Sequence, residues 1–136
     1  NLEVQPRPLE LGSFDQVVYQ HLEAIGLGEP LEPRVRVESQ GRVYVADYLA
    51  RCGDGTVLFI VETTNVGISF DPGELEPVLA SLLGRACAFE APFAALTDGA
   101  KWIWYERDNQ SLELLESAAP IQRHAEERRR PVRRGG

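Results

Sequence analysis

Two carboxylates stand within segments that otherwise have the composition of buried strands. Asp47 interrupts the largely apolar run of residues 43–49, and Glu62 directly follows the apolar run of residues 57–61. An ionised carboxylate inside a sheet is costly unless it is paired, binds a cation or shares a proton. Asp47 and Glu62 are therefore the candidate metal-binding and catalytic residues. The alternative for each is an edge position from which the carboxylate reaches water.

The connection between these two segments decides whether the carboxylates meet. Asp54-Gly55 is typical of a two-residue hairpin turn, and such a turn places Asp47 directly opposite Glu62 on one face. A three-residue loop over 53–55 shifts the register by one and moves Glu62 to the other face. Because opposed like charges destabilise a sheet, the first register favours a shared metal ion or a shared proton.

The elements needed to position these residues follow from periodicity and turn signals. A first helix is expected to begin at Ser13, and a second helix is expected between the third and the fourth strand. The expected helices are 13–25 and 74–89, and the expected strands are 34–38, 42–52, 56–64, 92–97, 101–106 and 111–115. This α-βββ-α-βββ order predicts one α/β domain with a mixed central sheet flanked by helices. We expect an N-terminal arm at 1–12, the domain at 13–120 and a basic tail at 121–136.

Charge is unevenly distributed along the chain. The net charge is −7, although residues 121–136 contain six arginines and only two glutamates. The acidic remainder is unfavourable for nucleic acid, whereas the tail arginines are candidate contacts for nucleic-acid phosphates or an acidic partner. The candidates are Arg123, Arg128, Arg129 and Arg130. The favoured interpretation of the tail, however, is a disordered or frayed basic extension over residues 124–136, and a contact for phosphate or an acidic partner is the alternative.

Several classes of protein are disfavoured by composition. No segment approaches the roughly 18 apolar residues of a membrane span, and residues 1–8 contain no hydrophobic signal core. We therefore expect a cytoplasmic protein without a membrane partner. Two cysteines and two histidines are too few for a common zinc site, and we expect two buried, reduced thiols, with a single disulfide as the alternative.

Two segments resemble a known family. Residues 44–48 (Tyr-Val-Ala-Asp-Tyr) and residues 60–64 (Ile-Val-Glu-Thr-Thr), joined by a hairpin, resemble the core of the PD-(D/E)XK nuclease superfamily. Within that superfamily the chain is most similar to the N-terminal domain of type I restriction enzyme R subunits. Residues 92–105, with Leu-Thr-Asp-Gly followed by tryptophan, resemble the late hairpin of that group. The resemblance covers about residues 13–116 and implies a restriction-endonuclease-like core.

The resemblance also implies a metal site. Asp47 and Glu62 would hold Mg²⁺ or Mn²⁺, and the backbone carbonyl of Thr63 would be a further ligand. The first helix of the family often adds another glutamate, for which Glu23 is the nearest candidate, with Asp15 behind it.

The chain departs from the family at two positions. Thr64 occupies the position of the family's catalytic lysine, and a hydroxyl carries no positive charge to stabilise a reacting phosphate. The Gln-x-x-x-Tyr element of the following helix is absent from residues 80–89. Arg51, on the strand of Asp47, is a candidate substitute for the missing cation.

These departures favour a degenerate nuclease-like domain that serves as a binding or assembly module. One alternative is an active Mg²⁺-dependent endonuclease that cleaves DNA phosphodiesters, with Asp47, Glu62 and Thr64 in the catalytic positions. A second alternative is an α/β protein-interaction domain without a metal site. The candidate partners are DNA, another protein or a second copy of the chain.

Overall fold

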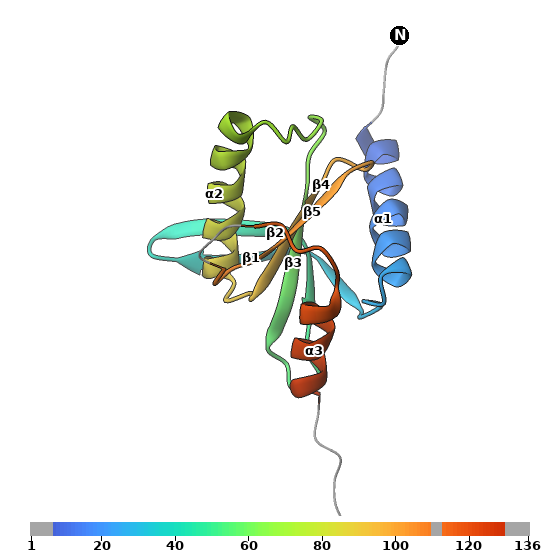
Figure 1. Cartoon of the computed structure of the whole chain (residues 1–136), viewed down its shortest axis with the longest axis vertical. Helices are drawn as coiled ribbons and strands as arrows, with labels where there is room; N and C mark the ends of the chain where they lie inside the picture. Colours follow the sequence, from blue (N-terminus) through green and yellow to red (C-terminus); the bar gives the residue numbers. More distant parts are fainter. Residues whose placement is uncertain (1–6, 110–112, 130–136) are drawn as a thin grey trace, which may run out of the picture.

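A mixed β-sheet forms the middle layer of the domain, with helices on both faces (Figure 1). The structure is a computed structural model that describes the backbone of residues 7–109 and 113–129, and side chains from residue 14 onward. The described strands are β1 (Leu31–Ser39), β2 (Arg42–Arg51), β3 (Val57–Thr63), β4 (Phe93–Thr97) and β5 (Trp102–Glu106). They lie side by side in the order of the chain. Neighbours are antiparallel except β3 and β4, which are parallel.

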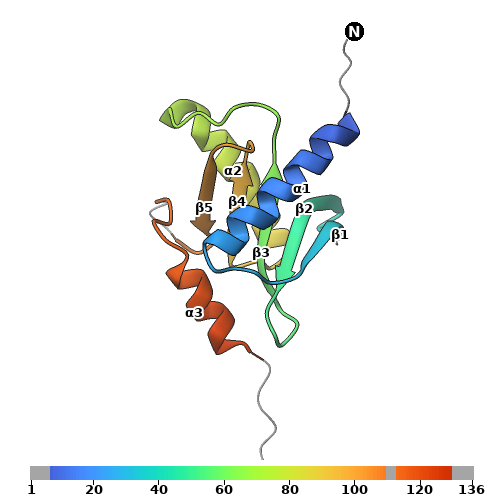
Figure 2. The same ribbon diagram turned by 90° about the vertical axis from the view of Figure 1, so that its right-hand side faces the viewer.

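The helices divide between the two faces of this open sheet. They are α1 (Arg7–Ala24), α2 (Pro72–Ala88) and α3 (Ala119–Glu127). Figure 2 shows α1 crossing one face while α2 lies behind the sheet. Buried residues of α1 and α3 share one hydrophobic cluster with the sheet, and α2 packs in the cluster on the other face. A parallel pair of strands needs a crossover, which α2 supplies between β3 and β4. The predicted α/β fold with a mixed sheet flanked by helices is confirmed.

The apolar runs of β3 and β4 result from their central position. Residues 58–61 are fully buried, and every residue of β4 is at most 8% exposed. Strands covered on both faces have continuous apolar sequences rather than alternating ones. Glu62 is the first residue of β3 to interrupt this run, at the end of the strand where the sheet meets α2.

The loop between β2 and β3 differs from the expected two-residue turn. It contains three residues, 53–55, and is closed by a hydrogen bond from the Cys52 N–H to the Thr56 carbonyl (2.7 Å). Gly55 has a φ of 92°, in the left-handed region that favours glycine. The three-residue loop is therefore the alternative that forms. By itself it would place Glu62 on the face of the sheet opposite to that of Asp47.

A bulge in β3 reverses this displacement. The paired residues are Arg51–Val57, then Ala50–Phe59, Leu49–Ile60 and Tyr48–Val61. Leu58 is thus an additional residue in β3, and its side chain packs on the same side as that of the next residue. The register beyond the bulge ends at the pair Tyr48–Val61, and continued by one residue it would set Asp47 opposite Glu62, the arrangement expected from the sequence, although the expected turn was wrong.

Near Asp47, the side chains of the β1–β2 hairpin switch from one face of the sheet to the other. Residues on one side of this point pack with α1, and residues on the other side pack with α2. The first group is Leu31 and Tyr48, and the second is Val35, Val37, Tyr44 and Ala46. Arg34, between the pairs Pro33–Tyr48 and Val35–Ala46, has a φ of 49° and so lies opposite Asp47 in a left-handed conformation. The ladder is interrupted at Asp47 on this side.

Three elements differ from expectation. Helix α1 begins at Arg7 rather than at Ser13, because a proline in the first turn of a helix is tolerated. Residues 113–115 are not a strand, although the Leu115 N–H donates to the Trp104 carbonyl (2.9 Å); the rest of that predicted strand, 111–112, lies outside the described residues. The start of the basic tail is helix α3, since Ile121 is buried in the α1 cluster.

The two cysteines are free in this structure. Cys52 is buried, as expected, whereas Cys87 is exposed on α2, so the expectation of two buried thiols was wrong for Cys87. No helix among the described residues is long and apolar enough to cross a membrane.

Candidate functional site

The carboxylate of Asp47 is occupied by hydrogen bonds from the facing strand. Its Oδ2 accepts from the backbone N–H of Thr63 (2.8 Å) and from the Thr63 hydroxyl (2.9 Å). The β2–β3 ladder ends at the pair Tyr48–Val61, and beyond this pair the carboxylate takes the place of a backbone acceptor. One oxygen of Asp47 therefore already has a structural function at the point where the strands separate.

Glu62 lies on the face of the sheet covered by α2. Its side chain is 13% exposed, and its Oε2 is fully buried without a hydrogen-bond donor among the described residues. The nearest cation is the Arg85 Nε, 3.9 Å away and likewise without a hydrogen-bond partner. Arg85 is held by its Nη1, which donates to the Ser81 hydroxyl one turn earlier on α2 (2.8 Å). A contact of 3.9 Å, too long for a formed hydrogen bond, thus links β3 to α2.

This environment changes the protonation of Glu62. Burial, followed by repulsion from the Asp47 charge, raises the pKa of Glu62 to about 8, and the opposing effect of Arg85 is smaller. A buried carboxyl without a donor favours its neutral form because desolvation penalises the charge. At neutral pH the folded protein therefore holds Glu62 mainly as the protonated acid.

Glu62 and Arg85 line a cleft of about 570 Å³, here called the α2 cleft. Its walls are the end of β3, the segment 64–69, Leu96 of β4 and a side of α2 on which Glu74, Pro77, Val78 and Ser81 are exposed, and apolar residues form much of the lining. The apolar residues in its lining are Val66, Ile68, Leu75, Pro77, Val78, Leu82 and Leu96. A carboxyl and a guanidinium within a mainly apolar cleft can orient a small polar group.

Asp98 holds one wall of the α2 cleft in place. Its carboxylate accepts the backbone N–H groups of Ile68 (2.9 Å), Ala100 (2.9 Å) and Lys101 (2.7 Å). These hydrogen bonds lower the pKa of Asp98 to about 2. The Lys101 Nζ also donates to the Ile68 carbonyl (3.0 Å), and Lys101 does not line the α2 cleft. The Leu-Thr-Asp-Gly motif therefore joins the β4–β5 turn to the loop after β3. The sequence showed only a turn there.

Thr64, at the position of the family's lysine, has a local structural role. Its N–H donates to the Thr97 carbonyl (3.0 Å), and its hydroxyl accepts from the Val66 N–H (3.1 Å). It lines the α2 cleft but brings no charge to it.

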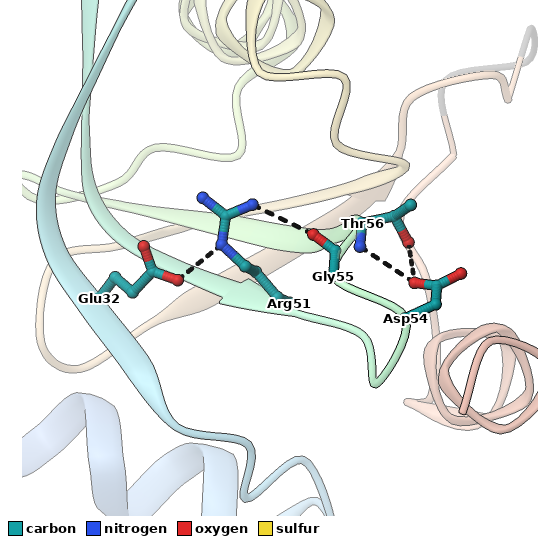
Figure 3. Close-up of polar contacts among 5 residues, drawn as sticks. All are labelled: Glu32, Arg51, Asp54, Gly55 and Thr56. Carbon is teal, nitrogen blue, oxygen red and sulfur yellow. Dashed lines mark hydrogen bonds and ion pairs between the residues drawn. The ribbon is translucent and has the colours of Figure 1, made fainter. Parts of the chain in front are cut away.

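Arg51 does not replace the missing lysine. It lies opposite Val57, and Glu62 is five residues farther along β3, about 17 Å at the usual rise of a strand. Its Nε donates to the Glu32 Oε2 (2.7 Å) and its Nη1 to the Gly55 carbonyl (3.2 Å), as Figure 3 shows. The structure gives no support to Arg51 as a substitute for the cation, because its position and its own partners keep it at the other end of the strand.

The further acids expected on α1 are not beside Glu62. Asp15 accepts a hydrogen bond from the Tyr48 hydroxyl, on the face of the sheet opposite to Glu62. Glu23 is exposed, eight residues and about 12 Å farther along the helix. Within residues 14–109 and 113–129, no group of three acidic, histidine or cysteine side chains could hold a metal ion. The donor set therefore does not fit a divalent cation: one oxygen of Asp47 is engaged by Thr63, Glu62 faces a guanidinium, and Glu74, which also lines the α2 cleft, forms no metal-binding group with them.

The predicted nucleic-acid contacts lie in three different settings. Arg123 is exposed on α3, and Arg129 is exposed and paired with Glu126 (2.8 Å). Arg128 lines a second cleft at the other end of the sheet. Arg130 lies outside the described residues.

Comparison with known proteins adds little to this geometry. No protein-family model matches the chain, and no curated protein matches it. A solved structure, that of SSO0001, is similar with a TM-score of 0.40 and 17% identity, over 88% of this chain and 56% of that one. The chain thus spans little more than half the length of this neighbour, and the likeness carries no conclusion about function.

Proposed function

We propose that this domain is a degenerate nuclease-like module that binds a partner and does not cleave. The observation that carries the proposal is the environment of Glu62. The carboxyl faces the Arg85 guanidinium of α2 within the α2 cleft, while the Asp47 carboxylate is occupied by Thr63. In the family that the sequence resembles, these two carboxylates hold the metal ion.

The chemistry of the residues supports the loss of cleavage. A divalent cation prefers ionised carboxylates, whereas the pKa of Glu62 is raised to about 8. A phosphoryl transition state also needs nearby positive charge, and Thr64 provides only a hydroxyl where the family has lysine. We expect the module to act in the cytoplasm, with DNA or another protein as its partner.

An active Mg²⁺-dependent endonuclease is the second candidate. The register that opposes Asp47 to Glu62 and the buried Glu62 Oε2 without a donor both favour it. A metal ion would have to displace the proton of Glu62 and compete with Arg85. Metal affinity would then rise steeply with pH up to about 8.

A thermal melt with and without millimolar Mn²⁺ separates the two candidates. The wild type is compared with Asp47→Asn, and Glu76→Gln, an exposed acid of α2, is the matched control. A ligand at 100 times its Kd would add about 2.7 kcal/mol, a shift of several degrees for a domain of this size. We expect no shift that depends on Asp47 and no nicking of supercoiled DNA. A shift and Mn²⁺-dependent nicking that both disappear in Asp47→Asn would overturn the proposal.

A gain-of-function variant tests the nuclease ancestry. Thr64→Lys combined with Arg85→Gln restores the missing cation and removes the competing one. We expect trace Mn²⁺-dependent nicking that Asp47→Asn abolishes. A folded double variant without any nicking would instead favour an unrelated interaction domain.

A further inference from the structure

A second cleft, here called the arginine cleft, lies at the end of the sheet opposite to the α2 cleft. It has a volume of about 470 Å³ and is formed where the β2–β3 loop, the turn after α2, the end of β5 and helix α3 meet. Its charged and titratable lining residues are Arg51, Arg107, Arg128, His124 and Glu90. Three arginines and one acidic residue, Glu90, thus line the cleft, and the carboxylates of Glu32 and Asp108 pair with two of the arginines beside it.

Two of these arginines are held in place by carboxylates beside the cleft. Arg51 donates its Nε to Glu32 (2.7 Å) and its Nη1 to the Gly55 carbonyl (3.2 Å), as Figure 3 shows. Arg107 donates its Nε and Nη2 to Asp108 (3.0 and 3.2 Å), and its side chain is only 27% exposed. Each guanidinium has five N–H groups in a rigid fork, so these contacts orient the side chain and occupy only two of them.

The third arginine reaches the cleft from α3. The Asp54 N–H donates to the Arg128 carbonyl (2.9 Å), which fixes the end of α3 against the β2–β3 loop. The charge of Arg128 acts on His124, whose pKa is lowered first by burial and then by Arg128. The His124 ring stands edge-on to Phe93, with centroids 5.7 Å apart. At neutral pH His124 therefore contributes an uncharged N–H rather than a further cation.

Several properties of the cleft select the class of ligand. Guanidinium groups from three separate segments suit an anion with several oxygens arranged around one centre, which a phosphate group provides. The volume exceeds that of a phosphate, and Val57, Phe89 and Pro92 add apolar surface for an organic group attached to it. A single carboxylate would leave most of the available donors unused.

We propose that the arginine cleft binds a phosphate group, carried by a small phosphomonoester such as a nucleotide or by a nucleic-acid strand. The site is independent of the absence of cleavage, because none of its residues lines the α2 cleft. With a nucleic-acid strand as ligand, the site rests on the proposed function and supplies a contact for its DNA partner, whereas the absence of cleavage and the phosphate site can each fail without the other.

The test uses the full chain and defined phosphate probes. Calorimetric titration with inorganic phosphate and adenosine 5′-monophosphate measures the affinity of the cleft for a free phosphate and for a small phosphomonoester. Titration with a short DNA strand that carries either a 5′-phosphate or a 5′-hydroxyl measures the affinity of the cleft for nucleic acid. Arg107→Gln and Arg128→Gln are compared with Arg123→Gln, which removes an exposed arginine of α3 that does not line the cleft.

We expect each cleft variant to weaken binding about tenfold or more, since each loses a charged hydrogen bond, and Arg123→Gln to change it less than about twofold. The imidazole NMR signals of His124 report the same event without relying on affinity. A bound phosphate stabilises the imidazolium, so the pKa of His124 should rise on saturation.

The outcomes decide both the site and the source of the phosphate. Preference for the monophosphate and the 5′-phosphorylated strand assigns a terminal phosphate, and equal binding of both strands assigns the nucleic-acid backbone. If Arg123→Gln weakened binding as much as the cleft variants, the affinity would come from the general positive charge of α3 rather than from the cleft, and the proposal would be overturned. Absence of binding by all probes at millimolar concentration would overturn it as well.

Discussion

Replacement of Glu62 by glutamine tests the central feature of the α2 cleft. The buried carboxyl has a pKa of about 8 in the folded protein, against an ordinary value of 4.5. Between these values the unfolded chain has released the proton and the folded protein still binds it. The free energy of unfolding therefore falls as the pH rises from 4.5 to 8, and the full stabilising contribution of the neutral carboxyl is present below 4.5.

The magnitude follows from the two pKa values. Their difference, at about 1.4 kcal/mol per pH unit, corresponds to about 5 kcal/mol of lost stability above pH 8 and about 3 kcal/mol at pH 7. Glutamine keeps the shape of the neutral acid and never ionises. We therefore expect Glu62→Gln to be more stable than the wild type by several kcal/mol at pH 8.5, and by less than about 1 kcal/mol at pH 5.

Urea unfolding monitored by tryptophan fluorescence, at half-unit steps from pH 5 to 8.5, measures this difference. Both tryptophans lie in β5, so their emission reports the sheet. Glu76→Gln, at an exposed position of α2, is the control and should follow the wild-type curve. Parallel curves for Glu62→Gln and the wild type would refute the reasoning, since they would mean that Glu62 is ionised when folded and that Arg85 or a cation compensates it.

Three further predictions concern the contact of α1 with β5, the docking of α3 and the loop after β3. The Trp104 Nε1 donates to the His21 Nε2 (3.4 Å), and burial lowers the pKa of His21 from its ordinary value of 6.5. The neutral imidazole therefore stabilises the fold above pH 6.5. This contribution to the free energy of unfolding is lost as the pH falls through the lowered pKa. His21→Gln should flatten that part of the urea-stability profile, and an unchanged profile would contradict the assignment. Ile121→Ala should cost about 2–4 kcal/mol in urea unfolding, because the side chain anchors α3 in the core; a cost as small as that of Arg123→Ala would show that α3 does not dock. Asp98→Ala should accelerate amide hydrogen exchange at Ile68, Ala100 and Lys101, and an unchanged exchange rate at Ile68 would show that the carboxylate does not hold the loop after β3.

Local patterns in the sequence were sufficient for most of the fold. Continuous apolar runs predicted β3 and β4, because strands buried on both faces are apolar at every position. Helical spacing of apolar residues predicted α2, because a helix on the surface of a sheet is buried on one side only. The Asp54-Gly55 pair correctly located the β2–β3 connection. The opposition of Asp47 to Glu62 was also predicted, although through a turn that does not form.

Other features depend on contacts between distant segments. A bulge at Leu58 restores the β2–β3 register, and its position follows from the packing of two adjacent side chains into one core cluster rather than from a turn signal. Docking of Ile121 turned a segment expected to be a disordered tail into helix α3. Such docking depends on an apolar surface built by α1 and the sheet, which residues near Ile121 do not reveal.

The sequence by itself determined which residues are candidates for chemistry, since an acid within an apolar strand is recognisable without coordinates. Only the tertiary structure decided what each candidate contacts. It set the Arg85 guanidinium beside Glu62 through the crossover helix, and it gathered Arg51, Arg107 and Arg128 from three segments into one cleft. The physical reason is that burial and charge act through space, so the pKa of a carboxyl or the anion affinity of a cleft depends on neighbours that the order of the chain does not specify.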